Sequence, residues 1–197
     1  MKALVIIPTY NECENIERLC RSILQAEPRA DVLVVDDNSP DGTGEIADRL
    51  AEETGRVQVL HRPGKLGLGS AEIAGLHRAM EQGYGCGITM DADFSHPPGR
   101  LPALINAARR CDVVIGSRYI PGGAVEGWPW RRKILSAGVN LLARTMLRLK
   151  PKDCSGGFRC YRTDTLARLD PDRIDARGYN FQEEMLWLCQ RSGLSIG

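Results

Sequence analysis

Short apolar runs alternate with longer amphipathic stretches over most of the chain. A continuous apolar run at residues 3–8 predicts a strand buried on both faces of a parallel sheet, and further strands are predicted at residues 31–37, 57–60, 86–90 and 112–116. The stretches between them repeat apolar residues at helical spacing, which predicts helices that end near residues 27, 53, 82 and 110. Strands that alternate with helices indicate one α/β domain, a mostly parallel sheet flanked by helices.

Two local signals place helix starts. Asn11 and Glu14 have the spacing of a capping box, so the first helix is predicted to begin beside them. Pro97 and Pro98 predict the start of the helix that ends near residue 110. The glycine-rich segment 64–69 is either a plain turn or a loop whose Lys65 reaches a phosphate, and the sequence leaves both open.

The composition narrows the functional classes. With 43% hydrophobic and 26% charged residues, the 197-residue chain is typical of a globular protein. A net charge of +1 gives no electrostatic case for nucleic-acid binding. Seven cysteines without a C-x-x-C pair indicate reduced thiols in the cytoplasm. We expect neither a signal peptide nor a membrane span, because no run approaches the ~20 apolar residues that a span needs.

The most polar residues of the first 120 positions follow the predicted strands. They lie at residues 8–12, 36–37, 91–93 and 116–118. Ligands of such folds bind beyond the carboxyl ends of the strands, so these segments are predicted to form one site. A P-loop is excluded because Val59 and Leu66 stand where it needs Gly and Ser or Thr, and a dinucleotide Rossmann fingerprint is excluded because no glycine follows the first strand.

Two acidic pairs carry the candidate chemistry. Asp91 and Asp93 are two positions apart at a strand end, so their side chains can share a face. Carboxylates that close repel unless a cation lies between them, and oxygen ligands favour Mg²⁺ or Mn²⁺. We expect Asp37 to be functional and Asp36 to be structural. His96 is expected to be a hydrogen-bonding residue rather than a ligand, because Mg²⁺ prefers oxygen.

Ordered motifs extend these signals along the whole chain. Four of them are Ile6-Ile-Pro-Thr-Tyr-Asn-Glu12, Val34-Val-Asp-Asp-Asn-Ser-Pro-Asp41, Met90-Asp-Ala-Asp93 and Gly116-Ser-Arg-Tyr119. Further motifs are Ser95-His-Pro-Pro98, Gly127-Trp-Pro-Trp-Arg-Arg-Lys133, Ser155-Gly-Gly-Phe158 and Gly178-Tyr-Asn-Phe-Gln182. Together they resemble the GT-A glycosyltransferases of family 2, and within them the polyprenyl-phosphate (dolichol-phosphate) mannosyltransferases.

The resemblance implies a single GT-A catalytic domain over residues 1–197, with a nucleotide-binding, Rossmann-like sheet. It implies inverting, metal-dependent transfer of mannose from GDP-mannose to a polyprenyl (dolichyl-type) phosphate. The donor is expected to contact Pro8, Tyr10, Glu12, Val35, Asp37, Asp91, Ala92, Asp93 and Arg118, with Lys65 added from the glycine-rich loop. Mg²⁺ or Mn²⁺ is expected on Asp91, Asp93 and Ser95.

The acceptor phosphate is already ionised, so it needs cations to bind and aim it rather than a strong base. It is expected on Ser117, Arg118, Arg131 and Arg132, and the expected catalytic residues are Asp91, Asp93, Arg118 and Arg131. Two alternatives are a UDP-sugar (glucose) polyprenyl-phosphate glycosyltransferase of the same fold and a non-catalytic nucleotide-sugar-binding domain.

The sequence departs from the family pattern in two places. Asn180 stands where some relatives carry a lysine, and the basic segment that usually follows the last strand lies beyond Gly197. Because residues 194–197 resemble the start of another strand, we expect the domain to lack a C-terminal strand and that basic segment.

Two tryptophans precede the basic run 131–133, and an apolar stripe with helical spacing follows over 134–149, together with Arg144 and Arg148. This combination is typical of a helix at a membrane surface, so we expect a protein peripheral to the cytoplasmic face of the membrane. The pattern fits a core-packed or homodimer-forming helix equally well.

Overall fold

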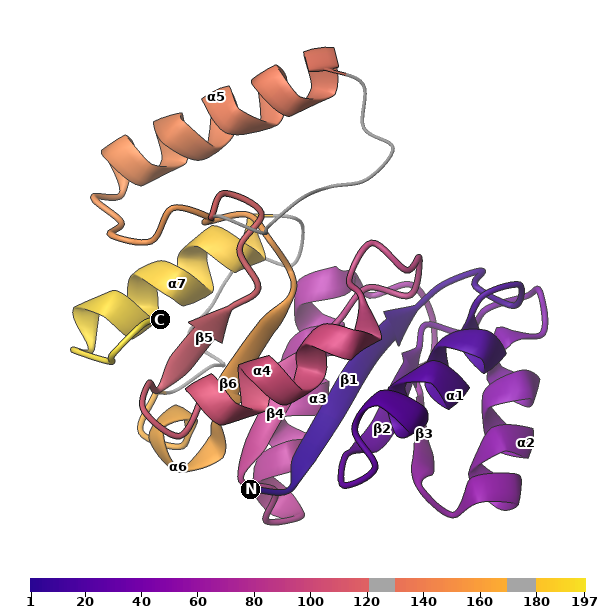
Figure 1. Ribbon diagram of the computed structural model, residues 1–197. Helices are drawn as coiled ribbons and strands as arrows, with labels where there is room; N and C mark the ends of the chain where they lie inside the picture. The colour runs from indigo at the N-terminus through magenta and orange to yellow at the C-terminus, as the bar shows by residue number, and fades with distance from the viewer. Residues whose placement is uncertain (121–129, 170–179) are drawn as a thin grey trace.

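A six-stranded sheet forms the centre of the computed structural model, which describes residues 1–120, 130–169 and 180–197 (Figure 1). The side chains of residues 130–135 and 139 are outside this description. The strands are β1 (Ala3–Thr9), β2 (Asp31–Asp36), β3 (Val57–His61), β4 (Cys86–Thr89), β5 (Val113–Ile115) and β6 (Arg159–Arg162). Their order across the sheet is β3-β2-β1-β4-β6-β5.

The sheet is mostly parallel, as predicted. β1 pairs in parallel with β2 and β4, and β2 with β3, whereas β6 runs antiparallel between β4 and β5. β6 was not predicted from the sequence. Its short run begins and ends with arginine, a pattern that does not indicate a buried strand, yet the side chain of Arg159 is fully buried.

Helices cover both faces of the sheet (Figure 1). They are α1 (Ile16–Ala26), α2 (Thr43–Thr54), α3 (Leu68–Glu81), α4 (Leu101–Ala107), α5 (Trp130–Met146), α6 (Thr163–Leu166) and α7 (Phe181–Arg191), with a 3₁₀ turn η1 (Pro98–Arg100) before α4.

Side chains of β1 alternate between two apolar cores, as expected for a strand buried on both faces. Val5 and Ile7 join the core under α1, α2 and α4. Leu4 and Ile6 join the core under α3 and α7. Gly75 lets α3 approach the sheet closely, because a Cβ atom there would lie 2.3 Å from Cγ2 of Ile6.

Three predicted helix boundaries were wrong. The capping box at Asn11 does not form: α1 begins only at Ile16, and Asn11 has a left-handed backbone (φ 62°). The main chain of Asn11 instead donates to Ser39, which ties this segment to the loop after β2. The fourth helix ends at Ala107 rather than near residue 110. α5 ends at Met146, because Arg148 has a left-handed backbone (φ 53°) and turns the chain away.

The C-terminal residues have the strand character that the sequence predicts. Ile196 forms a parallel bridge with Val113 of β5. The main chain of Gly197 donates to Val113 and accepts from Ile115, each at 2.9 Å. Among the residues that the structure describes, no helix combines the length and apolar character required to cross a bilayer.

Candidate active site

The polar segments predicted from the sequence meet at the carboxyl edge of the sheet. Strand register places Thr9 beside Asp36, and Ile6 beside Thr89, one position before Met90. Asp36 has a structural role here. Its carboxylate accepts hydrogen bonds from the hydroxyl groups of Thr9 at 3.1 Å and Ser39 at 2.6 Å.

The loops after β1 and β2 are joined by a second set of hydrogen bonds. The main chain of Glu12 donates to the Thr43 hydroxyl at 2.9 Å, and that of Cys13 donates to Asp41 at 3.1 Å. Burial would raise the pKa of Asp41, but hydrogen bonds from Thr43 and Cys13 outweigh it and lower the pKa to about 2. The segment predicted to hold the nucleoside is therefore braced by its own polar contacts.

Asp37, Lys65 and Tyr10 come together at this side of the site. Oδ2 of the buried Asp37 accepts a hydrogen bond of 3.0 Å from the main chain of Leu66. The ammonium group of Lys65 lies 4.1 Å from the ring centroid of Tyr10, a cation–π contact. The side chain of Val35 is fully buried in the core, so it offers no side-chain atom to a ligand.

His96 supports the end of β4. Its Nδ1 accepts a hydrogen bond of 3.0 Å from the main chain of Asp91, which places the ring proton of the neutral tautomer on Nε2. Its ring stacks on Phe158 with centroids 5.0 Å apart. Burial lowers the pKa of His96, although the carboxylates of Asp91 and Asp93 oppose this. His96 thus has the hydrogen-bonding role predicted for it.

Asp91 and Asp93 present carboxylates beyond β4. Burial raises the pKa of Asp91, with His96 opposing and Asp93 adding to the effect. Partial desolvation also acts to raise the pKa of Asp93, but hydrogen bonds from Ser95, including one of 2.9 Å from its main chain, lower it. Phe94, between Asp93 and Ser95 in this turn, has a left-handed backbone (φ 61°).

This donor set fits a hard cation. Two carboxylates and the Ser95 hydroxyl supply oxygen, which Mg²⁺ and Mn²⁺ prefer, and Mg²⁺ commonly takes its other ligands from water and substrate phosphates. Within the described residues, no cluster of three or more His, Cys, Asp or Glu side chains has the geometry of a metal site. Asp91 and Asp93 would therefore hold only part of the coordination shell. Ala92 is buried between them.

Arg118 lies after β5 and faces this edge. Its Nε and Nη2 donate to the two oxygens of Asp153 at 2.8 and 2.7 Å, and Nη2 also donates to Ser155 at 2.9 Å. Asp153 is fully buried, and its pair with Arg118 fixes the guanidinium. The preceding Ser117 accepts a hydrogen bond from the main chain of Tyr119 at 3.2 Å.

The remaining predicted acceptor residues, Arg131 and Arg132, belong to α5 by their backbone, but their side chains lie outside the described residues. The prediction that they bind the acceptor phosphate stays a prediction.

Residues 4–170 match the family model "Glycosyl transferase family 2". The chain belongs to this family of glycosyltransferases. An undecaprenyl-phosphate mannosyltransferase of Micrococcus luteus is 48% identical over 196 residues, which cover 100% of this chain and 81% of the relative. A polyprenol monophosphomannose synthase of Mycolicibacterium smegmatis is 44% identical over 197 residues, 99% of this chain and 74% of the relative.

Solved structures show the same fold at lower identity. The mannosyltransferase PcManGT of Pyrobaculum calidifontis, solved in complex with GDP-Man and Mn²⁺, superimposes with a TM-score of 0.59 at 20% identity. The match covers 91% of this chain and 50% of that one, so this chain spans half the length of that solved protein.

Several residues that support the candidate site were given no role from the sequence, although Gly157 and Gln182 lie in its motifs. A Cβ atom at Gly157 would lie 3.4 Å from Oδ1 of Asp91 and 3.5 Å from Nε2 of Gln182. Gln182 in turn donates to the buried Glu72 at 2.7 Å. The only available signal for Asp153 is its place two residues before the Ser155-Gly-Gly motif, and no signal in the sequence singles out Glu72.

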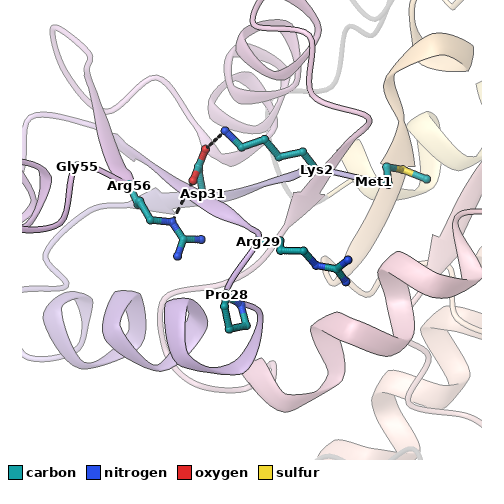
Figure 2. Close-up of a pocket in the computed structure, with 7 residues that line it drawn as sticks. All are labelled: Met1, Lys2, Pro28, Arg29, Asp31, Gly55 and Arg56. Atoms are coloured by element: carbon teal, nitrogen blue, oxygen red, sulfur yellow. Dashed lines mark hydrogen bonds and ion pairs between the residues drawn. The ribbon is translucent and has the colours of Figure 1, made fainter.

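A pocket of about 560 Å³ lies elsewhere, at the amino ends of β1, β2 and β3. Figure 2 shows Asp31 between Lys2 and Arg56 on its wall, at distances of 2.6 and 3.3 Å. These residues belong to the opposite edge of the sheet from Asp91, so the pocket is separate from the candidate site.

Proposed function

We propose that this chain transfers mannose from GDP-mannose to the phosphate of a polyprenyl (dolichyl-type) phosphate, with inversion at the anomeric carbon. The observation that carries the proposal is its 48% and 44% identity, over nearly its whole length, to two relatives named for mannosyl transfer to polyprenyl phosphates. The site supports it with three groups in sequence: Tyr10 and Asp37 for the nucleoside, Asp91 and Asp93 for the diphosphate, and Arg118 for the acceptor.

The family 2 site suits a divalent metal, which we propose is Mg²⁺ or Mn²⁺. Asp91 and Asp93 would hold it, with Ser95 near the third position. Such an ion neutralises the charge that develops on a leaving diphosphate. The aspartates then bind the metal ion and do not transfer a proton.

The acceptor needs positioning rather than activation. A phosphate monoester has a second pKa of about 6, so it is mostly dianionic at neutral pH. One of its oxygens attacks the anomeric carbon in line, the bond from that carbon to the diphosphate oxygen breaks, and an α-linked donor gives a β-linked product. Arg118, held by Asp153 through Nε and Nη2, supplies a positive charge fixed in position beside this edge of the sheet.

We also propose contact with an anionic membrane surface through α5. Leu141, Leu142 and Met146 are 58%, 59% and 74% exposed, and Arg148 beyond the helix is exposed too. Exposed apolar side chains next to arginines match the chemistry of a lipid surface, where the acceptor resides.

The direct test incubates the purified protein with Mg²⁺ or Mn²⁺, GDP-mannose labelled in the sugar and polyprenyl phosphate. Label is expected in the lipid fraction as a β-mannosyl phosphate, which NMR of the product identifies. Absence of transfer with either metal would refute the substrate assignment.

Two comparisons separate the alternatives. Thermal stabilisation by GDP and by UDP, each measured over a concentration series, distinguishes a GDP-mannose enzyme from one that uses a UDP-sugar. A non-catalytic binding domain would be stabilised by GDP-mannose and yet release no GDP in the presence of acceptor.

A further inference from the structure

β3 is flanked by two arginines that each pair with an aspartate of the neighbouring strand. Arg56, just before β3, donates to Asp31 at the start of β2 at 3.3 Å. Arg62, just after β3, donates through Nε to Asp37 beyond the end of β2 at 2.5 Å. The two pairs lie at opposite ends of β3. Only the pair formed by Arg62 lies at the carboxyl edge of the sheet, which carries the candidate site.

All three nitrogens of the Arg62 guanidinium donate hydrogen bonds. Besides the bond from Nε to Asp37, Nη1 donates to Ser70 at 2.8 Å and Nη2 donates to the carbonyl of Gly67 at 3.1 Å. The side chains of Arg62 and Asp37 are only 8% and 7% exposed. A buried guanidinium, bonded through all three of its nitrogens, connects the end of β2, the glycine-rich loop and the first turn of α3.

The position of this loop decides where Lys65 and Leu66 lie. The main chain of Leu66 donates to Oδ2 of Asp37 at 3.0 Å, while Lys65 lies over Tyr10 at 4.1 Å. Gly67 has a backbone conformation (φ 99°) that other residues rarely adopt, so the loop can close onto Arg62 only with glycine there.

Arg62 also orients the carboxylate of Asp37. It occupies Oδ1, while Oδ2 accepts one hydrogen bond among the described residues. A carboxylate oxygen can accept two, so Oδ2 keeps one acceptor position for a ligand donor such as a base N–H. Lysine could replace the charge of Arg62 but not its three-way planar fork.

We propose that Arg62 is a positioning residue for the donor nucleotide, because it aims Asp37 and holds the loop that places Lys65 over Tyr10. It touches no ligand itself, and its effect passes through these three side chains. The inference rests on the proposed function, since it assumes that the nucleoside diphosphate part of the donor binds at Asp37.

The test compares Arg62→Gln with the matched control Arg56→Gln, which breaks the corresponding pair at the other end of β3. GDP affinity is measured by calorimetry, the donor KM and kcat by transfer assay, and stability by thermal unfolding. Losing a charged, buried hydrogen-bond partner is expected to weaken GDP binding at least about tenfold and to raise the donor KM similarly, with kcat changed less than about threefold. Arg56→Gln is expected to lower stability while leaving GDP affinity unchanged.

Equal GDP affinity of wild type and Arg62→Gln would overturn the inference and leave the proposed function intact. Failure of the wild type itself to bind GDP would refute the donor assignment and the inference with it. If Arg62→Gln does not fold, Arg62→Lys serves instead, and weaker GDP binding at unchanged kcat is again expected. A lysine variant with wild-type GDP affinity and donor KM would overturn the role of the fork.

Discussion

The carboxyl group of Glu72 in α3 accepts a hydrogen bond of 2.7 Å from the side-chain amide of Gln182 in α7. Glu72 is 1% exposed, and within the described residues its Oε2 has no hydrogen-bond partner. Burial raises the pKa of Glu72 to about 8, with the nearby Arg159 and the Gln182 bond opposing and Asp91 adding to the effect. The folded protein therefore holds a proton on Glu72 at neutral pH.

Because Glu72 is protonated in the folded state, the stability of the wild type is expected to depend on pH. Glu72→Gln is expected to remove this dependence. An unfolded glutamate has a pKa of about 4.3, so between that pH and about 8 the folded state binds the extra proton. The free energy of unfolding should then fall as pH rises through this window, by up to about 1.4 kcal/mol per pH unit. Urea unfolding at pH 5 and pH 8 is expected to show Glu72→Gln gaining stability relative to wild type at the higher pH. Parallel pH profiles of the two proteins would contradict the prediction.

The pair of Arg118 and Asp153 predicts a coupled loss of activity and stability in Asp153→Asn. The substitution puts an amide donor among the four hydrogen bonds that Asp153 accepts, from Arg118 and from the main chain of Gly156. Breaking a buried ion pair typically costs about 3–5 kcal/mol. Transfer, measured below the unfolding temperature of the variant, is expected to fall at least about tenfold because the fork of Arg118 is released.

A matched control is Asp112→Asn. Asp112 directly precedes β5, whereas Arg118 follows the other end of that strand. Asp112 accepts hydrogen bonds from Ser195 and lies 3.9 Å from Arg162, away from the site. The Asp112→Asn variant should lose stability but keep the transfer rate of the wild type. Equal rates in Asp153→Asn and wild type would show that the pair does not position Arg118 for turnover.

The first half of the fold and the carboxyl edge could be predicted from sequence because both depend on local signals. Apolar runs such as 3–8 and 31–37 mark strands buried on both faces, and acids such as Asp91 directly follow them. β6 could not be predicted because Arg159 is buried. Its charge is accommodated by the carbonyl oxygens of Cys154, Gly156 and Gln182, contacts that only the tertiary fold creates.

The supporting residues of the site were missed for the same reason. Asp153 and Arg118 are 35 residues apart in sequence, and Glu72 and Gln182 are 110 apart, so no periodicity connects them. The capping-box prediction failed where a tertiary contact, from Asn11 to Ser39, replaced a local one. Local sequence patterns thus predicted the residues that face the ligand. The residues that hold them in place could be identified only from the structure.

Asp93→Ala is expected to abolish metal-dependent transfer without unfolding the protein. Asp93 is exposed, so its removal leaves no buried group unpaired. The loss of a carboxylate ligand of the metal ion should lower the transfer rate at least about a hundredfold. Binding of Mn²⁺, followed by electron paramagnetic resonance, should weaken in parallel. The control is Asp48→Ala, another exposed aspartate that pairs only with His61 among the contacts described. Retained transfer in Asp93→Ala would show that the metal site is misplaced.

The exposed face of α5 predicts that membrane binding depends on Leu142 and Met146. They lie four residues apart, so they share one side of the helix, which stands apart from the sheet at the top of Figure 1. The double variant Leu142→Glu/Met146→Glu should reduce flotation with vesicles containing phosphatidylglycerol at least about tenfold, because two apolar contacts are replaced by charges that repel the lipid. Gln25→Glu, which adds a negative charge to an exposed position of α1, should float as wild type does. If the double variant still floats but changes from dimer to monomer in light scattering, α5 is a subunit interface and the membrane proposal fails.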